Sequence, residues 1–531
     1  MNSIPKVGIW VALIIATFVI SALAALLIET PSLDIRQVWG DPYYRHVTKF
    51  SFYQAFLSAL LSVGFAIPVA HALSRRQFKG KELLLKLFAT TLVLPVLVGV
   101  FGLLAIYGNS GWLSTWLKSI GSELPFSIYG LNGILLAHVF FNLPYASRLL
   151  IQALDTVPTE QHKLCAHLGM SHWDKFKWVE WPRLKQQLPH VFGLVFMLCF
   201  TSFATVMALG GGPKSTTIEL AIYQAIKFDF DLQAGALLAM WQMLLCAVIA
   251  FTIQRLSKPL SVTAGAIHKQ IYLSRDTWLS KGWDSFWIMG ALLLVIPPLL
   301  MVILSGLNSQ LPHVLTDARF WSAFGASIKV ASLASLIAVC VGISILITSR
   351  AMRLRNKNRS ADQIEMMGTI ILVTPGLVIS TGLFLLIRNL TDVFSAASVV
   401  VIAVNALMAL PFVIKTLAQP MLHIGQQYQY VCASLGMKGW QRLRVVEFRA
   451  LRKPFAHAFA ISFMFSIGDL SAIALFGSQE FRTLPLYLFQ LLGSYQMDAA
   501  AVVSVTLLLL SVSCFALIET LLRANKGSSS C

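Results

Sequence analysis

Charged side chains are scarce in this 531-residue sequence: 12% of its residues are Asp, Glu, Lys or Arg, and 57% are hydrophobic. This composition excludes an ordinary soluble globular fold. Runs of about twenty apolar residues indicate instead a polytopic membrane protein. Acidic residues are the rarer charge, so the formal net charge is +18. The basic excess is concentrated between the apolar runs, and we therefore expect no nucleic-acid partner.

Paired cysteines and nucleotide motifs are also lacking. The seven cysteines are scattered without a CxxC pair, which argues against a disulfide framework or a zinc site. The segment GGGPKST at 210–216 faintly resembles a phosphate loop, but it has Pro-Lys in place of Gly-Lys and follows an apolar span. No H-E-x-x-H cluster indicates an intramembrane enzyme. We expect the chain to bind no metal or cofactor and to depend on another subunit for ATP hydrolysis.

The apolar runs predict an all-α protein with about twelve membrane-spanning helices. The first run follows Lys6, so a cleaved signal peptide is the alternative there, although the length of the run favours a retained span. The predicted spans are 8–28, 52–74, 88–108, 131–152, 189–210, 233–254, 284–307, 324–349, 368–388, 396–417, 456–477 and 497–520.

Lysine and arginine alternate between rich and poor connections along the chain. By the positive-inside rule, the rich connections and both termini are predicted to be cytoplasmic, in a bacterial inner membrane. The basic surface can also attract anionic lipid headgroups. The rich connections lie around 75–86, 163–185, 255–281, 350–359 and 438–453, and the poor ones around 109–130, 308–323 and 479–496.

One of the rich connections is duplicated. The segment CAHLGMSHWDKFKWVE at 165–180 recurs as CASLGMKGWQRLRVVE at 432–447, with eight of sixteen positions identical. In the first copy Gly169 can end one short helix and Ser171 can cap the next. On that second helix Trp173, Phe176 and Val179 share one face, as do Trp440, Leu443 and Val446 in the second copy. These faces can dock on a cytosolic partner or pack on the protein itself, and their duplication favours two copies of a partner.

The repeat extends beyond these loops, with the same spacing on both sides. Each half contains an even number of predicted spans, so both insert in the same sense as parallel repeats with a path between them. We predict a first half at 1–254 (core 52–254), a linker at 255–283 and a second half at 284–531 (core 324–520). Matching positions include Leu143-Pro144 with Leu410-Pro411, Pro95 and Gly102 with Pro375 and Gly382, and Gly210 with Gly477.

The duplicated segment resembles the EAA loop of ABC importer permeases. The similarity is clearest at Cys165-Ala166-x-x-Gly169 followed by Trp181-Pro182, and it recurs at Cys432-Ala433-x-x-Gly436. The family's glutamate falls on Lys163 and Tyr430, and Phe448-Arg449 replace the Trp-Pro pair. The resemblance implies a fused type I permease fold that works with a periplasmic binding protein and two copies of a cytoplasmic ATP-binding subunit.

The residues predicted to couple to those ATP-binding subunits occupy matching positions in the two loops. They are Cys165, Ala166, Gly169, Met170, Trp173, Phe176 and Glu180 in the first loop, and Cys432, Ala433, Gly436, Met437, Trp440, Leu443 and Glu447 in the second.

Segments outside the loops resemble the permeases of bacterial thiamine importers. They are residues 50–62, 133–144, 210–224 and 481–488. This resemblance implies thiamine or its phosphates as the small-molecule substrate, delivered by a periplasmic thiamine-binding protein. Other ligands of the same class, such as ferric iron, a polyamine or a phosphonate, remain alternatives. A secondary transporter with two parallel repeats is a further alternative, but it leaves the duplicated loop unexplained.

Three polar residues within predicted spans are candidates for the translocation path. Asp469 is a charge at membrane depth, which marks it as a functional candidate. It can attract a cationic thiazolium ring, or it can hydrogen-bond the backbone at a helix break beside Gly468. His138 and Asn142 can contact substrate or join helices by hydrogen bonds. Glu219, Asp229 and Asp231 on the outer side can contact a binding protein, but they are expected to be solvated loop charges.

Overall fold

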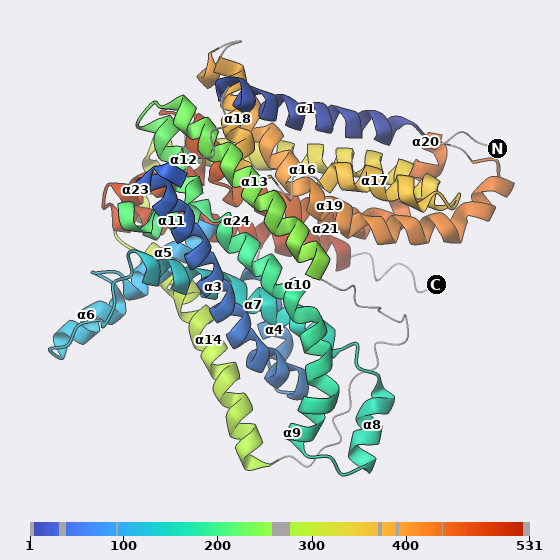
Figure 1. Cartoon of the computed structure of the whole chain (residues 1–531), viewed down its shortest axis with the longest axis horizontal. Coiled ribbons are helices and arrows are strands. Elements are labelled where there is room, and N and C mark those ends of the chain that lie inside the picture. Colours follow the sequence, from blue (N-terminus) through green and yellow to red (C-terminus); the bar gives the residue numbers. More distant parts are fainter. Residues whose placement is uncertain are drawn as a thin grey trace.

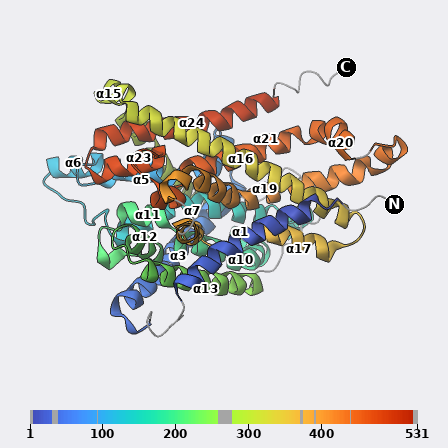
Figure 2. The same ribbon diagram turned by 90° about the horizontal axis from the view of Figure 1, so that it is seen from above.

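The computed structural model describes residues 5–30, 39–91, 94–256, 277–369, 374–388, 392–437 and 439–523. All regular secondary structure in these ranges is helical, which confirms the predicted all-α class (Figures 1 and 2). We call the end of the bundle that carries α8, α9 and α20 the basic end, and the end that carries α6, α12 and α23 the opposite end. The predicted linker lies mostly in 257–276, outside the described residues.

The helices follow the same order in both halves. Those of the first are α1 (Val7–Glu29), α3 (Pro42–Arg75), α4 (Lys81–Thr91), α5 (Val96–Tyr107), α6 (Trp112–Ser119), α7 (Leu131–Leu154), α8 (Thr159–His167), α9 (His172–Lys175), η1 (Phe176–Glu180), α10 (Trp181–Phe200), α11 (Phe203–Leu209), η2 (Pro213–Ser215), α12 (Ile218–Lys227) and α13 (Leu232–Leu256). Those of the second are α14 (Trp278–Gly306), α15 (Leu311–Thr316), α16 (Ala318–Arg353), α17 (Asn358–Thr369), α18 (Gly376–Arg388), α19 (Val393–Ser434), α20 (Gly439–Arg442), η4 (Leu443–Glu447), α21 (Phe448–Gly468), α22 (Ser471–Phe476), α23 (Leu484–Gly493) and α24 (Met497–Arg523).

Ten helices of the described ranges are long and apolar enough to cross a membrane, and an eleventh span results if α10 and α11, bent by 53°, are taken together. The predicted spans 88–108 and 368–388 differ from the observed helices because a proline interrupts each of them. Pro95 precedes α5 and Pro375 precedes α18, which has only 13 residues. Proline lacks the N–H that an uninterrupted helix needs, so each predicted span straddles the start of a new helix.

The first helix of each half packs against the other half. Helix α1 contacts α16, α17 and α18, and helix α14 contacts α3 and α5. Figures 1 and 2 both show α1 running alongside the helices of the second half. This packing makes α1 an integral part of the helical bundle and favours a retained span over a signal peptide. Each half is therefore completed by a helix that the other half supplies.

Equivalent glycines allow these two exchanged helices to approach closely. A Cβ atom on Gly102 in α5 would lie 2.5 Å from the carbonyl oxygen of Pro298 in α14. A Cβ atom on Gly382 in α18 would collide in the same way with the carbonyl oxygen of Ala22 in α1. Small residues at a helix crossing permit backbone contact, which is the main source of packing energy between helices in lipid.

Valine at either glycine should therefore separate the exchanged helix from its partner. We expect Gly102→Val and Gly382→Val each to destabilise the solubilised chain by about 1–3 kcal/mol or more, because the clash is with backbone. The measurement is the midpoint of thermal unfolding in detergent. Gly290→Val is the control, because no atom lies within 4 Å of a Cβ at Gly290 on α14. Equal destabilisation by the control would contradict the role of the two crossings.

A buried ion cluster fixes the start of α14 to the end of α3. Asp284 is 1% exposed, and its Oδ2 lies 2.6 Å from Nε of Arg76. Its Oδ1 accepts a hydrogen bond from Nη2 of Arg75, which is itself only 9% exposed. Two positive charges at the basic end thus share one buried carboxylate from the other half. Such a cluster is stable only while all its members are present.

Candidate coupling loops and translocation path

The two duplicated loops have the local structure that their spacing predicts. Helix α8 is followed by Gly169 with a φ of +63°, and Gly436 has a φ of +65° at the same point of the second loop. Glycine adopts this left-handed conformation without strain. The hydroxyl of Ser171 then accepts a hydrogen bond from the backbone N–H of Asp174 at 3.2 Å and caps α9.

Each loop continues into a π-helical segment. It spans Phe176–Glu180 (η1) in the first loop and Leu443–Glu447 (η4) in the second. Short π-helical segments are rare and occur frequently at functional sites. The same irregularity occurs in both copies, although three of the five residues differ, and this indicates a shared requirement on backbone geometry.

Both π-helical segments end at a buried glutamate held by basic side chains. Oε2 of Glu180 lies 2.8 Å from Nε2 of His71 on α3, and Oε1 lies 3.5 Å from Nζ of Lys175. Burial opposes ionisation of Glu180, but the hydrogen bond with His71 and the nearby positive charges lower its pKa below the usual value. The first loop is thereby tied to the end of α3.

The second loop repeats this arrangement with two arginine side chains in place of His71 and Lys175. Oε1 of Glu447, which is 2% exposed, lies 2.9 Å from Nη2 of Arg350 on α16 and 2.8 Å from Nε of Arg442. Helices α3 and α16 are the corresponding helices of the two halves. The predicted loop residues Glu180 and Glu447 therefore face their own half rather than solvent.

The outer face of the first loop differs from the predicted one. Trp173 is 68% exposed, but Phe176 turns inward, with its ring centroid 4.8 Å from that of His71. Trp178, which the helical spacing does not place on this face, is 65% exposed. The prediction assumed α-helical periodicity through residue 179, whereas the wider π-helical turn shifts the register. Lys175 is buried beside Glu180.

The remaining predicted loop residues fall into three groups. Cys165 and Cys432 are buried, Met170 and Met437 are half-buried, and Ala166 is exposed. The side chains of three further predicted residues lie outside the described part of the structure. These are Ala433, Trp440 and Leu443.

A cavity of about 1000 Å³ lies between the two halves. The first half contributes the segment before α5 together with residues of α10, α11, α12 and α13. The second contributes the segment before α18 together with residues of α19, α21 and α22. A cavity of this size accommodates a ligand as large as an ordinary drug molecule.

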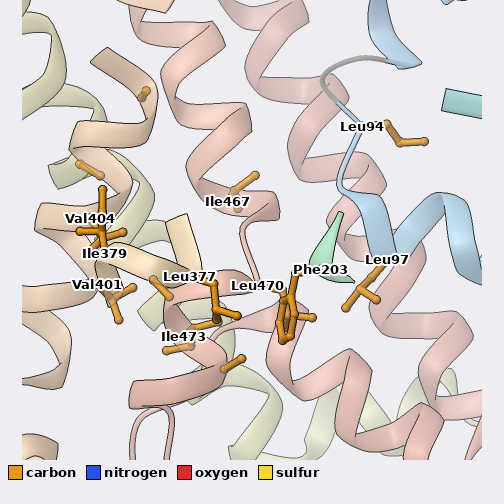
Figure 3. Close-up of a cluster of buried hydrophobic side chains, with 14 of the residues drawn as sticks. Leu94, Leu97, Phe203, Leu377, Ile379, Val401, Val404, Ile467, Leu470 and Ile473 are labelled. Carbon is orange, nitrogen blue, oxygen red and sulfur yellow. The ribbon is translucent and has the colours of Figure 1, made fainter. Parts of the chain in front are cut away.

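Apolar side chains from both halves fill the interface at one end of this cavity. Phe203 and Leu470, which follow the bends after α10 and α21, are 4% and 2% exposed. Figure 3 shows them at the centre of a buried cluster, with Leu97 and Leu377 on either side. Each of these two pairs joins matching positions of the repeat. The cluster therefore forms an apolar, nearly symmetric barrier.

Further contacts join the halves at the opposite end, while the basic end is spread apart. Nζ of Lys227 donates hydrogen bonds to the carbonyl oxygens of Leu475 at 3.2 Å and Gly477 at 3.1 Å in the other half. The cavity lining reaches His190 and Lys415 toward the basic end. Figure 1 shows α9 and α20, which mark the two loops, far apart. The cavity thus opens toward the basic end.

Asp469 both caps a helix and lines the cavity. Its Oδ1 accepts hydrogen bonds from the hydroxyl of Ser471 at 2.7 Å and from the backbone N–H of Ser471 at 3.3 Å. Its Oδ2 accepts one from the N–H of Ala472 at 3.2 Å. These contacts match the predicted alternative in which Asp469 hydrogen-bonds the backbone at a helix break. Asp469 also lines the cavity, so it is accessible to a molecule bound there.

The other two predicted path residues lie between helices. Nδ1 of His138 is 2.8 Å from the hydroxyl of Ser58, which joins α7 to α3. Nδ2 of Asn142 donates to Sγ of Cys199 at 3.4 Å and joins α7 to α10. Neither residue lines the cavity between the halves. The structure therefore places both in helix packing and not on this path.

Glu219 is a cavity residue that the sequence prediction placed elsewhere. It is 3% exposed on α12 and lines the same cavity as Asp469, so it is not a solvated charge. A helical pattern in the sequence could have revealed this position. Glu219 shares a face with Ile222 and Tyr223 at spacings of three and four residues, and both are buried.

Residues 62–261 and 341–525 each match the family described as "Binding-protein-dependent transport system inner membrane component". The chain belongs to this family and is a multi-pass inner-membrane transport subunit, which removes the secondary-transporter alternative.

Relatives that match this chain over nearly its full length share one name. The "Thiamine transport system permease protein ThiP" of Escherichia coli is 49% identical over 98% of this chain and 96% of its own length. The proteins of that name from Haemophilus influenzae and Brucella abortus are 41% and 39% identical, over 97% and 91% of this chain and 95% and 88% of their own lengths.

Proposed function

We propose that this chain is the membrane permease of an ATP-binding-cassette importer that carries thiamine or its phosphates across the inner membrane. The observation that carries this proposal is similarity along nearly the whole chain to thiamine permeases, at up to 49% identity. The cavity between two family-matching halves supports it, because it provides a path at the interface where a parallel repeat is expected to have one.

The partners follow from the two loops and from the class of the permease. Two copies of a cytoplasmic ATP-binding subunit dock on the loops, one on each half, and Trp173 and Trp178 provide exposed anchors in the first loop. A periplasmic thiamine-binding protein delivers substrate at the opposite end. Both termini and the basic end face the cytoplasm, where anionic lipid headgroups surround them. The chain itself binds no cofactor, and ATP is hydrolysed by the partner.

The geometry corresponds to a state open to the cytoplasm. The halves touch at the opposite end through the Phe203–Leu470 cluster and are apart at the loops. ATP binding draws the two partner subunits together, and the loops transmit this movement to the helices above them. The basic end then closes and the barrier opens to accept substrate. Release of nucleotide products restores the state described here.

Copurification followed by transport tests the proposal. The chain is solubilised gently from its native membrane, and the proteins that accompany it are identified and counted. We expect an ATP-binding subunit at about two copies per chain, and ATP-dependent thiamine uptake after reconstitution with the binding protein. Ferric iron, a polyamine and a phosphonate are offered as competing substrates. Uptake of one of these, with none of thiamine, would replace the proposed substrate.

Proline in place of either loop glycine should uncouple the transporter. Gly169 and Gly436 have φ angles of +63° and +65°, whereas proline is fixed near −65°. We expect Gly169→Pro and Gly436→Pro to lower the ratio of thiamine imported to ATP hydrolysed at least tenfold. Gly121→Pro is the matched control, because Gly121 also has a positive φ of +76° but lies far from the loops. Normal uptake in both loop variants would contradict the coupling role.

A further inference from the structure

Glu219 is a buried residue whose carboxylate has no partner among the described residues. It is 3% exposed, lines the cavity, and makes no hydrogen bond or ion pair with any described residue. Its helix is held firmly in place, since the N–H of Ile218 donates to the hydroxyl of Ser51 on α3 at 3.0 Å. Burying an ionised carboxylate without compensation is costly. A partner from outside the chain would remove this cost.

A second carboxylate faces the same cavity from the other half. Asp469 lines the cavity beside α22, and α12 contacts α22 directly. The three hydrogen bonds that Asp469 accepts leave part of its acceptor capacity free, because an ionised carboxylate has about four acceptor positions. Two like charges near one another repel unless a cation lies between them. The pair therefore makes one end of the cavity attractive to positive charge.

The rest of the lining defines which kind of cation would fit. Aromatic and thioether groups line the same cavity as the two carboxylates, and Phe412 and Phe465 stack with centroids 4.3 Å apart. Hard metal ions such as calcium take about six to eight oxygen ligands, more than two carboxylates would supply. An aromatic ring with a delocalised positive charge is weakly hydrated and can use both the apolar walls and the carboxylates.

We propose that Glu219 and Asp469 together form a subsite that binds the cationic ring of an aromatic organic cation on its way between the halves. This inference rests on the proposed import function and deepens it, because it gives the permease its own selectivity for charge. Each half supplies one carboxylate, so the subsite lies at the interface between the two halves.

The first test compares uptake by charge-removing and charge-keeping variants. The permease with its ATP-binding subunits is reconstituted, and labelled thiamine is supplied with the binding protein. We expect Glu219→Gln to reduce uptake at least tenfold and Glu219→Asp to retain much of it, while ATPase stimulation by the binding protein persists in both. Glu480→Gln is the control, because Glu480 is an exposed glutamate at the same end of the molecule. Asp469→Asn should also reduce uptake, although its role as a helix cap makes Glu219 the primary position.

The second test measures charge selectivity directly. Unlabelled 3,4-dimethylthiazolium (a cation) and 4-methylthiazole (a neutral ring of similar shape) compete with thiamine uptake. The binding protein is the same in every reaction, so a difference between variants arises in the permease. We expect the cation to compete better with the wild-type chain and to lose that advantage in Glu219→Gln.

The outcomes separate this inference from the proposed function. If Glu219→Gln imports thiamine with the rate and selectivity of the wild-type chain, the proposed subsite is overturned and the proposed function stands. An equal loss in Glu219→Asp and Glu219→Gln would also overturn the subsite, because shape and not charge would then matter. Absence of thiamine uptake by the wild-type chain would overturn the proposed function itself.

Discussion

Replacing Asp284 with alanine is expected to prevent most of the chain from reaching a stable fold. The substitution leaves Arg75 and Arg76 without their shared carboxylate, and Arg75 is only 9% exposed. Removing one member of a buried ion pair costs about 3–5 kcal/mol, because the remaining charge is still desolvated. A typical protein has a net stability of about 5–15 kcal/mol, so this loss is a large fraction of the total. It also releases α14 from the half that it completes.

The measurement is the fraction of solubilised chain that stays monodisperse on heating. Glu123→Ala is the control, since Glu123 is exposed at the opposite end. A double-mutant cycle with Arg76→Gln adds a second criterion. Because the two residues form one unit, the double variant should be less destabilised than the sum of the single variants. A melting curve for Asp284→Ala that overlays the Glu123→Ala curve would show that the cluster contributes nothing to stability.

Glu447→Gln is expected to cause the largest loss of transport without loss of assembly. Glu447 ties the second loop to α16 through Arg350, and its removal leaves Arg350 and Arg442 without their carboxylate. A loosened loop transmits the movement of the ATP-binding subunit poorly. We expect thiamine uptake to fall at least tenfold, and ATP hydrolysis to become insensitive to the binding protein. Glu180→Gln should act in the same direction on the first loop, where His71 takes the place of Arg350.

The readouts are uptake and ATPase activity in the same proteoliposomes, with the number of copurified ATP-binding subunits as a check on assembly. Combining Arg350→Gln with Glu447→Gln should cost little beyond either change alone, because both remove the same tie. Full coupling in Glu447→Gln, with normal subunit number, would show that the buried glutamate has no part in transmission. A loss of the subunits themselves would instead assign Glu447 to assembly.

Features that depend on local pattern could be predicted from the sequence. The apolar runs predicted the helical class, and the glycine and serine of the first duplicated loop predicted its two turns. These predictions succeeded because each of the effects acts within a few residues. The helix breaks at Pro95 and Pro375 could also have been predicted from the prolines themselves. Hydropathy alone does not detect them, because the apolar run continues on both sides of the proline. The prediction of the outer face of the first loop was wrong beyond Trp173, because no residue pattern marks the start of a π-helical turn.

Features that depend on contacts between distant segments could not be predicted in this way. The exchange of α1 and α14 joins residues hundreds of positions apart, and no local pattern in the sequence marks such a pairing. Glu219 was placed in solvent because it lies between the predicted spans 189–210 and 233–254, whereas its own helix turns it into the cavity. For His138 and Asn142, the predicted alternative of hydrogen bonds between helices describes the observed contacts.

The exchange of first helices also sets an order of events during synthesis. The N–H of Gly8 in α1 donates to the hydroxyl of Thr348 in α16, 340 residues later. At a synthesis rate of about 5–20 residues per second, α1 waits in the bilayer for roughly 20–70 s before α16 is made, with α13 as its earlier partner in its own half. It is suited to waiting, because its sequence from Val7 to Ile28 has no charged residue that lipid would penalise. Helix α14, in contrast, meets α3 and α5 as soon as it inserts, so the first helix made is among the last to be packed.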